Sequence, residues 1–397
     1  METRSIAAAR CAIIGGGPAG MMLGLLLARA GVRVIVLEKH ADFLRDFRGD
    51  TIHPSTFELM HELGLLDQFL RLPHQKAVQM KYVIDGHVVS MADFSRLPTM
   101  CKYMGFMPQW HFLNFLATQA KQFPAFELRM ESRVVDLVHD ADRIVGVRAK
   151  TPQGDLEVRA DLVIGCDGRN STVRQLAKLE VKDVGVPIDV LWMHVSKRER
   201  DPEQFFGFVR RGQGLGLIDR GDYFQVGFVI PKGGIDKLKK RGLPALHEGI
   251  VALAPFLQDR IIELDDWSKI KLLTVQINRL PKWYREGLLC IGDAAHAMSP
   301  AAGVGINLAI QDAVAAANLL AAKLKTPPVS MADLAAVQKR REWPTRLVQA
   351  MQASVHRYAM TRNLVVNALQ WLPAIQFLTA RFIGMGPRPE HIRSPAA

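Results

Sequence analysis

The chain has 397 residues, of which 49% are hydrophobic and 23% charged, an ordinary composition for a globular protein large enough to form two lobes. Its net charge of +12 (51 basic minus 39 acidic residues) favours anionic ligands such as nucleotide phosphates. The basic residues are dispersed and carry no nucleic-acid-binding motif, so nucleic acid is not expected as a partner. No apolar run reaches the roughly 18 residues of a transmembrane helix, and no secretory signal is recognisable.

The four cysteines are Cys11, Cys101, Cys166 and Cys290. Three of them lie in or at the end of apolar, strand-like runs, and none has the C-x-x-C or histidine spacing of a metal site. We therefore expect buried free thiols and no metal. Such thiols are typical of a reducing compartment, which predicts a cytoplasmic protein.

The first predicted elements form a βαβ unit. Cys11–Ile14 predicts a strand, a helix follows to about Ala30, and Val32–Leu37 predicts a second strand. The turn Gly15-Gly16-Gly17-Pro18-Ala19-Gly20 carries the G-x-G-x-x-G pattern of a dinucleotide site. Gly15 permits the tight turn, Gly17 lets backbone approach a pyrophosphate, and Gly20 lets the helix pack on the strand. The phosphates would bind at the helix N-terminus.

Glu38 closes the second of these strands. A carboxylate at this position accepts hydrogen bonds from ribose hydroxyls and disfavours a 2′-phosphate. The bound nucleotide is therefore expected to be the adenosine of FAD or NAD.

The next segments interrupt the α/β alternation. Pro54 is expected to begin a helix over Ser55–Leu63, and Asp85-Gly86 joins two strands, Val78–Ile84 and His87–Ala92, as a hairpin. A helix is predicted at Gln109–Lys121. Strands are then predicted at Glu127–Met130, Ser132–Val138, Arg143–Lys150 and Leu156–Ile164, the last leading into Cys166-Asp167-Gly168.

From about Val186 to Val229 the pattern is wholly β. Gly212, Gly214 and Gly216 resemble a second phosphate loop, but no helix follows them, which rejects a second dinucleotide motif. Trp192 and His194 share one face if their segment is a strand. They would then either face a ligand together or be ordinary core or surface residues.

Lys269–Asn278 predicts a further strand, and Leu288–Ile291 another that enters Gly292-Asp293-Ala294-Ala295-His296. An alanine-rich helix should run to about Lys323, and helical patterns fill Met331–Ile383. Because no linker or internal repeat separates these parts, the two lobes should be interleaved along the chain.

Three motifs together carry a family resemblance: GGGPAG at 15–20, CDG at 166–168, and GDAAH at 292–296 followed by PAAGVGIN at 300–307. In this order they resemble the class A flavoprotein monooxygenases of the para-hydroxybenzoate hydroxylase type, over residues 10 to 325. The resemblance implies an α/β fold: a Rossmann-like FAD-binding lobe (1–75, 106–180 and 276–330) interleaved with an antiparallel β-sheet substrate lobe (76–105 and 181–275), then a C-terminal helical segment (331–397).

The resemblance also implies where noncovalent FAD binds. Arg48 and Gln109 would lie near the pyrophosphate, Val134 near the adenine, and Asp293 at the ribityl chain, while Asp167 is associated with FAD and reduced nicotinamide. The expected FAD-binding residues are Gly15, Gly17, Pro18, Ala19, Gly20, Glu38, Lys39, Arg48, Gln109, Val134, Asp167, Asp293, Pro300, Gly303, Gly305, Ile306 and Asn307.

The stretch from Pro300 to Gly305 has a physical rationale of its own. It leads into a helix N-terminus near Ile306-Asn307, whose free N–H groups can hold negative charge at the flavin N1–C2=O edge. His296 is expected to orient this loop. No residue is assigned as catalytic with certainty, because the flavin carries the chemistry; Pro300 and His296 are the only candidates.

The implied activity is that of an FAD-dependent monooxygenase. Reduced nicotinamide (NADPH or NADH) would reduce the flavin, O2 would add at its C4a position as a hydroperoxide, and a small aromatic substrate would be hydroxylated or epoxidised, with Trp192 and His194 as candidate contacts. The alternatives are a flavin-dependent reductase of lipid double bonds, a ubiquinone-type hydroxylase at a membrane surface, and a non-enzymatic FAD-binding protein. A halogenase is disfavoured because no W-x-W motif occurs. A monomer or homodimer is expected.

The stretch Asn363–Ile383 is apolar, with Arg381 as its only charge and Pro373 interrupting it. It can pack against the FAD-binding lobe or an oligomer partner, or it can lie in a membrane interface. We favour packing, because the polar face expected of an interfacial helix is thin.

Overall fold

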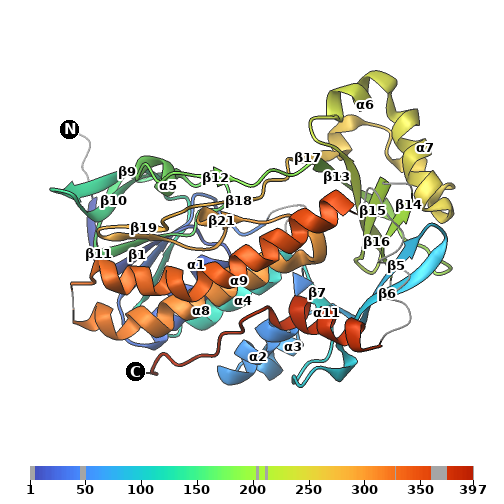
Figure 1. Ribbon diagram of the computed structural model, residues 1–397. Coiled ribbons are helices and arrows are strands. Elements are labelled where there is room, and N and C mark those ends of the chain that lie inside the picture. The colour runs from blue at the N-terminus through green and yellow to red at the C-terminus, as the bar shows by residue number, and fades with distance from the viewer. Residues whose placement is uncertain are drawn as a thin grey trace.

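The computed structural model describes residues 5–44, 51–202, 205–210, 213–326, 328–358 and 373–396. Figure 1 shows a larger body, built on one sheet with long helices across it, and a second sheet at the opposite end carrying α6 and α7. The predicted α/β class, with two sheets and C-terminal helices, is confirmed.

The first sheet has the order β19-β20-β11-β1-β2-β8, and β10 and β9 extend it beside β11. Strands β20, β11, β1, β2 and β8 pair with one another in parallel, whereas β19 and β10 pair antiparallel with β20 and β11. The bounds are β1 Ser5–Ile14, β2 Val34–Leu37, β8 Phe126–Arg129, β9 Arg133–Asp140, β10 Arg143–Thr151, β11 Gly154–Gly165, β19 Tyr284–Arg285 and β20 Leu288–Cys290. β1 begins earlier than predicted, because its first residues pair with the long β11.

Four helices pack against one another in the body built on the first sheet (Figure 1). They are α1 (Pro18–Arg29), α4 (Gln109–Ala120), α8 (Val304–Lys325) and α9 (Met331–Tyr358). The segment Ala301–Lys325, which contains α8, is long and apolar enough to cross a bilayer, but 78% of its apolar window is buried inside the protein. Within the described residues, its composition is therefore explained by a core position. All four cysteines are buried and unpaired, as predicted.

The second sheet has the order β17-β13-β16-β15-β14-β5-β6. One of its faces packs under α7 (Leu243–Leu253) and α6 (Ile235–Arg241) in a separate apolar core. The strands are β5 Gln79–Ile84, β6 His87–Asp93, β13 Ile188–Ser196, β14 Phe205–Arg210, β15 Gln213–Asp219, β16 Tyr223–Pro231 and β17 Lys271–Leu273. The hairpin at Asp85-Gly86 is confirmed, and Gly214 and Gly216 lie within the strand β15, not before a helix. Gly212 lies outside the described residues.

Smaller elements connect the two sheets. β3 (Thr51–Ile52), β7 (Met104–Phe106) and β4 (Gln75–Ala77) form one three-stranded sheet, and β12 (Lys182–Asp183), β18 (Asn278–Arg279) and β21 (His296–Ala297) form another. The short helices near them are α2 (Pro54–Glu62), α3 (Leu66–Leu70) and α5 (Thr172–Leu176).

The single strand predicted at Lys269–Asn278 is wrong. The segment contains two short strands, β17 and β18, in different sheets: β17 pairs with β13, and β18 with β12 and β21. Val275 and Ile277 between them are fully buried. The run is apolar because the chain is buried where it crosses between the two sheets, and not because it forms one strand.

The described C-terminal helix is α11 (Pro373–Met385), which contacts β6 and α2. Ala380 and Ile383 are buried, and Phe377 and Phe382 join the same apolar cluster. The described part of the apolar stretch thus packs these side chains against the protein. Residues 363–372 of that stretch lie outside the described residues.

Candidate functional site

The glycine turn between β1 and α1 has the geometry that a pyrophosphate loop needs. Gly15 has φ +105°, and a Cβ there would lie 2.5 Å from the Cys166 carbonyl oxygen. A Cβ on Gly20 would collide with the Gly15 carbonyl, whereas one on Gly17 would meet no atom within 4 Å. Gly17 therefore faces open space beside the N-terminus of α1, which begins at Pro18 and Ala19 and has no side-chain cap.

Glu38 lies directly beside this turn. Its Oε2 accepts a hydrogen bond from Gly16 N at 2.8 Å, and its Oε1 accepts one from His40 N at 3.1 Å. Each carboxylate oxygen keeps further acceptor capacity for a ribose hydroxyl. Lys39 follows it as an exposed residue.

The D-G and G-D motifs meet at one place. Asp293 lies in the short 3-10 turn Gly292–Ala294, with its Oδ2 3.7 Å from Nη2 of Arg169. Asp167 instead makes its hydrogen bonds within its own segment. It accepts one from Ser171 Oγ at 2.5 Å and one from Val173 N at 3.1 Å, at the start of α5. Burial raises the pKa of the Asp167 carboxyl despite these bonds.

Sequence reasoning did not single out Arg169 and Arg174. Nη1 of Arg169 is buried and has no partner among the described residues, although its side chain borders the half-exposed Asp293. Arg174 donates to the carbonyls of Arg169 and Ala294, so it joins the two motif loops. The available signal was the position of Arg169 directly after D-G, where a cation can meet an anionic ligand.

The loop before α8 is held in an unusual backbone conformation. Ala302 and Gly303 have φ of 59° and 63°, in the left-handed region. A Cβ on Gly303 would lie 2.9 Å from Thr51 Cβ, so only glycine fits there. The N-terminus of α8 at Val304 has no side-chain cap, which leaves its first N–H groups, around Gly305 and Ile306, available to a ligand.

Two buried glutamines of α9 hold this loop from behind. Nε2 of Gln352 donates to the carbonyls of Ser299 and Ala301 at 3.0 and 3.1 Å, and its Oε1 accepts from Ser299 N at 3.1 Å. Nε2 of Gln349 donates to the Ala297 carbonyl at 3.0 Å. Pro300 is therefore flanked on both sides by backbone that α9 holds in place.

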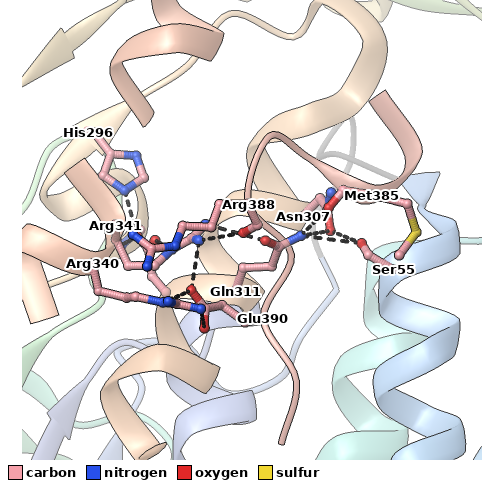
Figure 2. A network of polar contacts seen from close by, with 11 residues as sticks. Ser55, His296, Asn307, Gln311, Arg340, Arg341, Met385, Arg388 and Glu390 are labelled. Carbon is pink, nitrogen blue, oxygen red and sulfur yellow. Dashed lines mark hydrogen bonds and ion pairs between the residues drawn. The ribbon is translucent and has the colours of Figure 1, made fainter. Parts of the chain in front are cut away.

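A buried polar network links the G-D turn to the C-terminal segment (Figure 2). Asp312 of α8, fully buried, accepts hydrogen bonds from His296 Nε2 at 2.6 Å, from Gly292 N at 3.1 Å and from Arg341 Nε at 3.0 Å. Arg341 also binds Glu390 Oε1 at 3.1 Å. Burial acts to raise the pKa of the Asp312 carboxyl, but the combined effect of His296 and Arg341 lowers it. His296 is thus directed into the protein interior.

A second branch of the network starts at Asn307. Its Oδ1 accepts hydrogen bonds from Ser55 Oγ at 2.5 Å and from Gln311 Nε2 at 3.3 Å. Gln311 Nε2 also donates to the Met385 carbonyl at 3.0 Å, as Figure 2 shows. The side-chain oxygen of Asn307 therefore serves packing between α2, α8 and the C-terminal segment, and any contact of Asn307 with FAD would use other atoms.

The remaining predicted residues occupy separate places. Gln109 is the first residue of α4, and Val134 is buried in β9, two residues after Ser132, whose N donates to the Glu38 carbonyl at 2.8 Å. Val134 therefore lies close to the glycine turn in the folded structure. Arg48 lies outside the described residues. Where the structure is described, no group of three or more His, Cys, Asp or Glu side chains could hold a metal ion.

Trp192 and His194 lie on the face of the second sheet that is opposite α7. Leu191, Met193 and Val195 enter the core under α7, and the alternation of β13 turns Trp192 and His194 the other way. The indole lies across Gly227, since a Cβ there would be 2.9 Å from its ring. His194 packs its ring 4.7 Å from that of Tyr223. Nε1 of Trp192 is buried and has no partner among the described residues.

Comparison with known proteins identifies related chains. A family model described as an FAD binding domain matches residues 8–351. The 6-methylpretetramide 4-monooxygenase of Streptomyces rimosus is 32% identical over 93% of this chain and 88% of its own length. A rifampicin monooxygenase of Streptomyces venezuelae is 33% identical over 76% of this chain and 61% of its own length. The solved OxyS anhydrotetracycline hydroxylase of Streptomyces rimosus matches with a TM-score of 0.76 and 25% identity, covering 95% of this chain and 76% of that one.

Proposed function

Because the chain belongs to the family of FAD-dependent class A flavoprotein monooxygenases, we propose that it hydroxylates a planar, multi-ring aromatic substrate on the free face of its second sheet. The coarser activity, FAD-dependent oxygenation of aromatic compounds, follows from the family. The multi-ring substrate, the residues that bind FAD and the lobe boundaries given above are our proposals.

The residues present fit FAD. The open space at Gly17, the uncapped helix N-termini at Pro18 and Val304, and the unpartnered Nη1 of Arg169 offer donors and room to an anionic dinucleotide. Bound noncovalently, FAD would supply the redox and oxygen chemistry, with NADPH or NADH as the electron donor. The protein would hold the pyrophosphate at α1, the ribityl chain at Asp293, and negative charge on the ring at α8.

The observation that carries the substrate proposal is a row of glycines across the second sheet. Gly227, Gly216 and Gly207 are paired in register on β16, β15 and β14. Trp192 pairs at one end of this row and Tyr82 at the other. The Trp192 indole covers Gly227, so Gly216 and Gly207 form the strip of backbone without side chains between this indole and the Tyr82 ring. Such a strip suits a planar ligand longer than one ring.

The free face of the second sheet is also connected to the proposed flavin loop. Tyr82 packs against a cluster that contains Met298, Ala302 and Val304, on either side of Pro300. Burial raises the pKa of the Tyr82 hydroxyl to about 12, so it is neutral at physiological pH. Two relatives of this chain are named as monooxygenases of 6-methylpretetramide and of rifampicin.

The test is to incubate purified protein with FAD, reduced nicotinamide, O2 and a panel of one-ring and multi-ring phenols. We expect multi-ring compounds to gain one oxygen atom, by mass spectrometry, with matching O2 uptake. A Gly216→Val variant should lose binding of multi-ring compounds while keeping that of single-ring ones, which makes the small ligand the internal control. Reduced nicotinamide consumed without O2, with a reduced double bond in the product, would favour the lipid-reductase alternative and contradict the proposal.

The cellular setting is also part of the proposal. We propose a cytoplasmic monomer or homodimer whose partners are the substrate and O2, and neither nucleic acid nor a membrane. The packing of Ala380 and Ile383 against the protein supports the last point. Flotation with anionic liposomes at low salt, together with light scattering, would test it; protein that floats would contradict it.

A further inference from the structure

We propose that His53 is a positioning residue that ties the flavin-binding loop to the C-terminal helix α11, with its ring proton on Nδ1. The proposal rests on the FAD assignment above and concerns a residue outside all the motifs of the sequence analysis. Through it, the C-terminal helix would set the conformation of the loop that approaches the flavin ring.

The geometry of His53 places it between two carbonyls from distant parts of the chain. The residue is fully buried and immediately precedes Pro54, the first residue of α2. Its Nδ1 lies 2.8 Å from the Ile383 carbonyl oxygen of α11, and its Nε2 lies 3.1 Å from the Gly303 carbonyl oxygen. The imidazole therefore lies between the loop before α8 and the C-terminal helix.

A neutral imidazole has one N–H and cannot donate to both carbonyls. Burial lowers the pKa of His53 to about 4, against the effect of its two backbone contacts, so the ring is neutral at physiological pH. Its single proton must then be assigned to one of the two nitrogens.

The surroundings of the two carbonyls decide this assignment. The Gly303 carbonyl already accepts a hydrogen bond from Thr51 Oγ1 at 3.1 Å. The Ile383 carbonyl lies in the last turn of α11, where the residue four positions later is Pro387, which has no N–H. The Ile383 carbonyl thus needs a donor, and the shorter contact is the one to Nδ1. A buried carbonyl left without a donor is costly, so the proton belongs on Nδ1.

The end of α11 that His53 contacts is also held by α2 and α8. A Cβ on Gly384 would lie 3.1 Å from Pro54 Cγ, so α11 approaches α2 closely at this point. One residue further, the Met385 carbonyl accepts the hydrogen bond from Gln311 of α8. With the proton on Nδ1, Nε2 of His53 has no hydrogen to give to the Gly303 carbonyl, which is held instead by Thr51 Oγ1, two residues before His53. The short segment from Thr51 to His53 therefore holds the loop at one end and α11 at the other, and the end of α11 is also bound to α8. Loss of the Nδ1 donor should loosen the loop that carries the left-handed Ala302 and Gly303.

The test compares three substitutions that differ in where they offer an N–H. His53→Asn places an amide near the position of Nδ1, His53→Gln places one near Nε2, and His53→Leu offers none. We expect His53→Asn to bind FAD most nearly like the wild type. His53→Gln and His53→Leu should each raise the FAD Kd about tenfold, as expected for a buried carbonyl that loses its donor. His139→Leu, at an exposed histidine of β9, is the matched control.

Two readouts separate positioning from a general loss of stability. The visible absorption spectrum of bound FAD should shift in the leucine and glutamine variants, because the ring environment changes. Hydrogen exchange in the apoprotein should accelerate at residues 300–305 in these variants and not in His53→Asn. Should His53→Leu fail to fold, the asparagine and glutamine variants alone decide the question.

The proposal is overturned if all three variants keep the wild-type Kd, spectrum and exchange rates, or if glutamine rather than asparagine restores them. If the wild-type protein itself binds no FAD, it is the proposed function that fails. The apoprotein exchange measurement then still tests the tie between His53 and Ile383.

Discussion

Single residues in the glycine turn carry different physical requirements, although the motif treats them alike. Gly20 is required by the fold, because any side chain there would meet the Gly15 carbonyl. Gly17 is not, because the space beyond its Cα is open. The structure therefore separates a glycine that the fold needs from one whose side-chain space the fold leaves open.

We expect Gly17→Ala to fold with a thermal midpoint near that of the wild-type apoprotein while binding FAD at least tenfold more weakly. Gly20→Ala should instead lower the midpoint strongly, because backbone must move to admit the methyl group. Differential scanning fluorimetry of the apoproteins and fluorescence titration with FAD measure the two effects. Equal losses of stability in both variants would contradict this separation.

His53 also predicts how stability depends on pH. Its folded-state pKa, about 4, lies below the ordinary histidine pKa of 6.5, so the unfolded chain binds more protons between these values. Stability should therefore rise with pH from about 4 to 6.5, and this residue accounts for up to about 3 kcal/mol of the change. Urea unfolding across this range should show a flatter profile in His53→Asn. An identical profile in the two proteins would be evidence against a neutral buried ring.

Helix α8 contributes both to the proposed flavin site and to the buried polar network. Its uncapped N-terminus faces the proposed flavin site, while Asp312, two turns further, is fully buried and hydrogen-bonded to His296 and Arg341. The ion pair between Asp312 and Arg341 joins α8 to α9, and Glu390 extends it to the C-terminal segment. These elements should therefore lose stability together.

Arg341→Met should lower the free energy of unfolding by about 3 to 5 kcal/mol, because Asp312 and Glu390 would stay buried without this cation. The matched control is Arg346→Met on the same helix, whose exposed pair with Glu342 at 3.6 Å should contribute less than about 1 kcal/mol. Chemical denaturation measures both. A loss below about 1 kcal/mol for Arg341→Met would mean that the network adds little to stability.

In the whole molecule, the two sheets are joined where the chain crosses between them. Asp189 of β13, almost fully buried, accepts hydrogen bonds from Val275 N at 3.0 Å, Gly233 N at 2.9 Å and Lys232 Nζ at 2.9 Å. The crossing segment between β17 and β18 is thus attached to the second sheet at this carboxylate.

Replacing Asp189 with alanine should loosen the second sheet and raise the KM for the aromatic substrate, while FAD affinity stays within about twofold of the wild type. The reason is that the three donors lose their acceptor near the sheet and far along the chain from the glycine turn. Substrate titration and FAD titration of the same preparation distinguish the effects. Weakened FAD binding with an unchanged KM would be the opposite of this expectation.

The sequence by itself was enough for the βαβ unit, the hairpin at Asp85-Gly86, the β-only stretch and the long C-terminal helices, because these depend on local periodicity and on glycine and proline chemistry. It also placed the three motifs that identify the family. Each of these features is encoded within a short window of residues.

Only the tertiary structure decided which polar side chains face the site and which are used inside the protein. Asn307 and Asp167 matched family motifs, yet they bond to Ser55 and Ser171. Arg169 and His53 were not singled out from the sequence, yet they lie beside the motif loops. The strand predicted at Lys269–Asn278 failed for the same reason. Burial and hydrogen-bond partners come from residues hundreds of positions apart, and no local pattern records them.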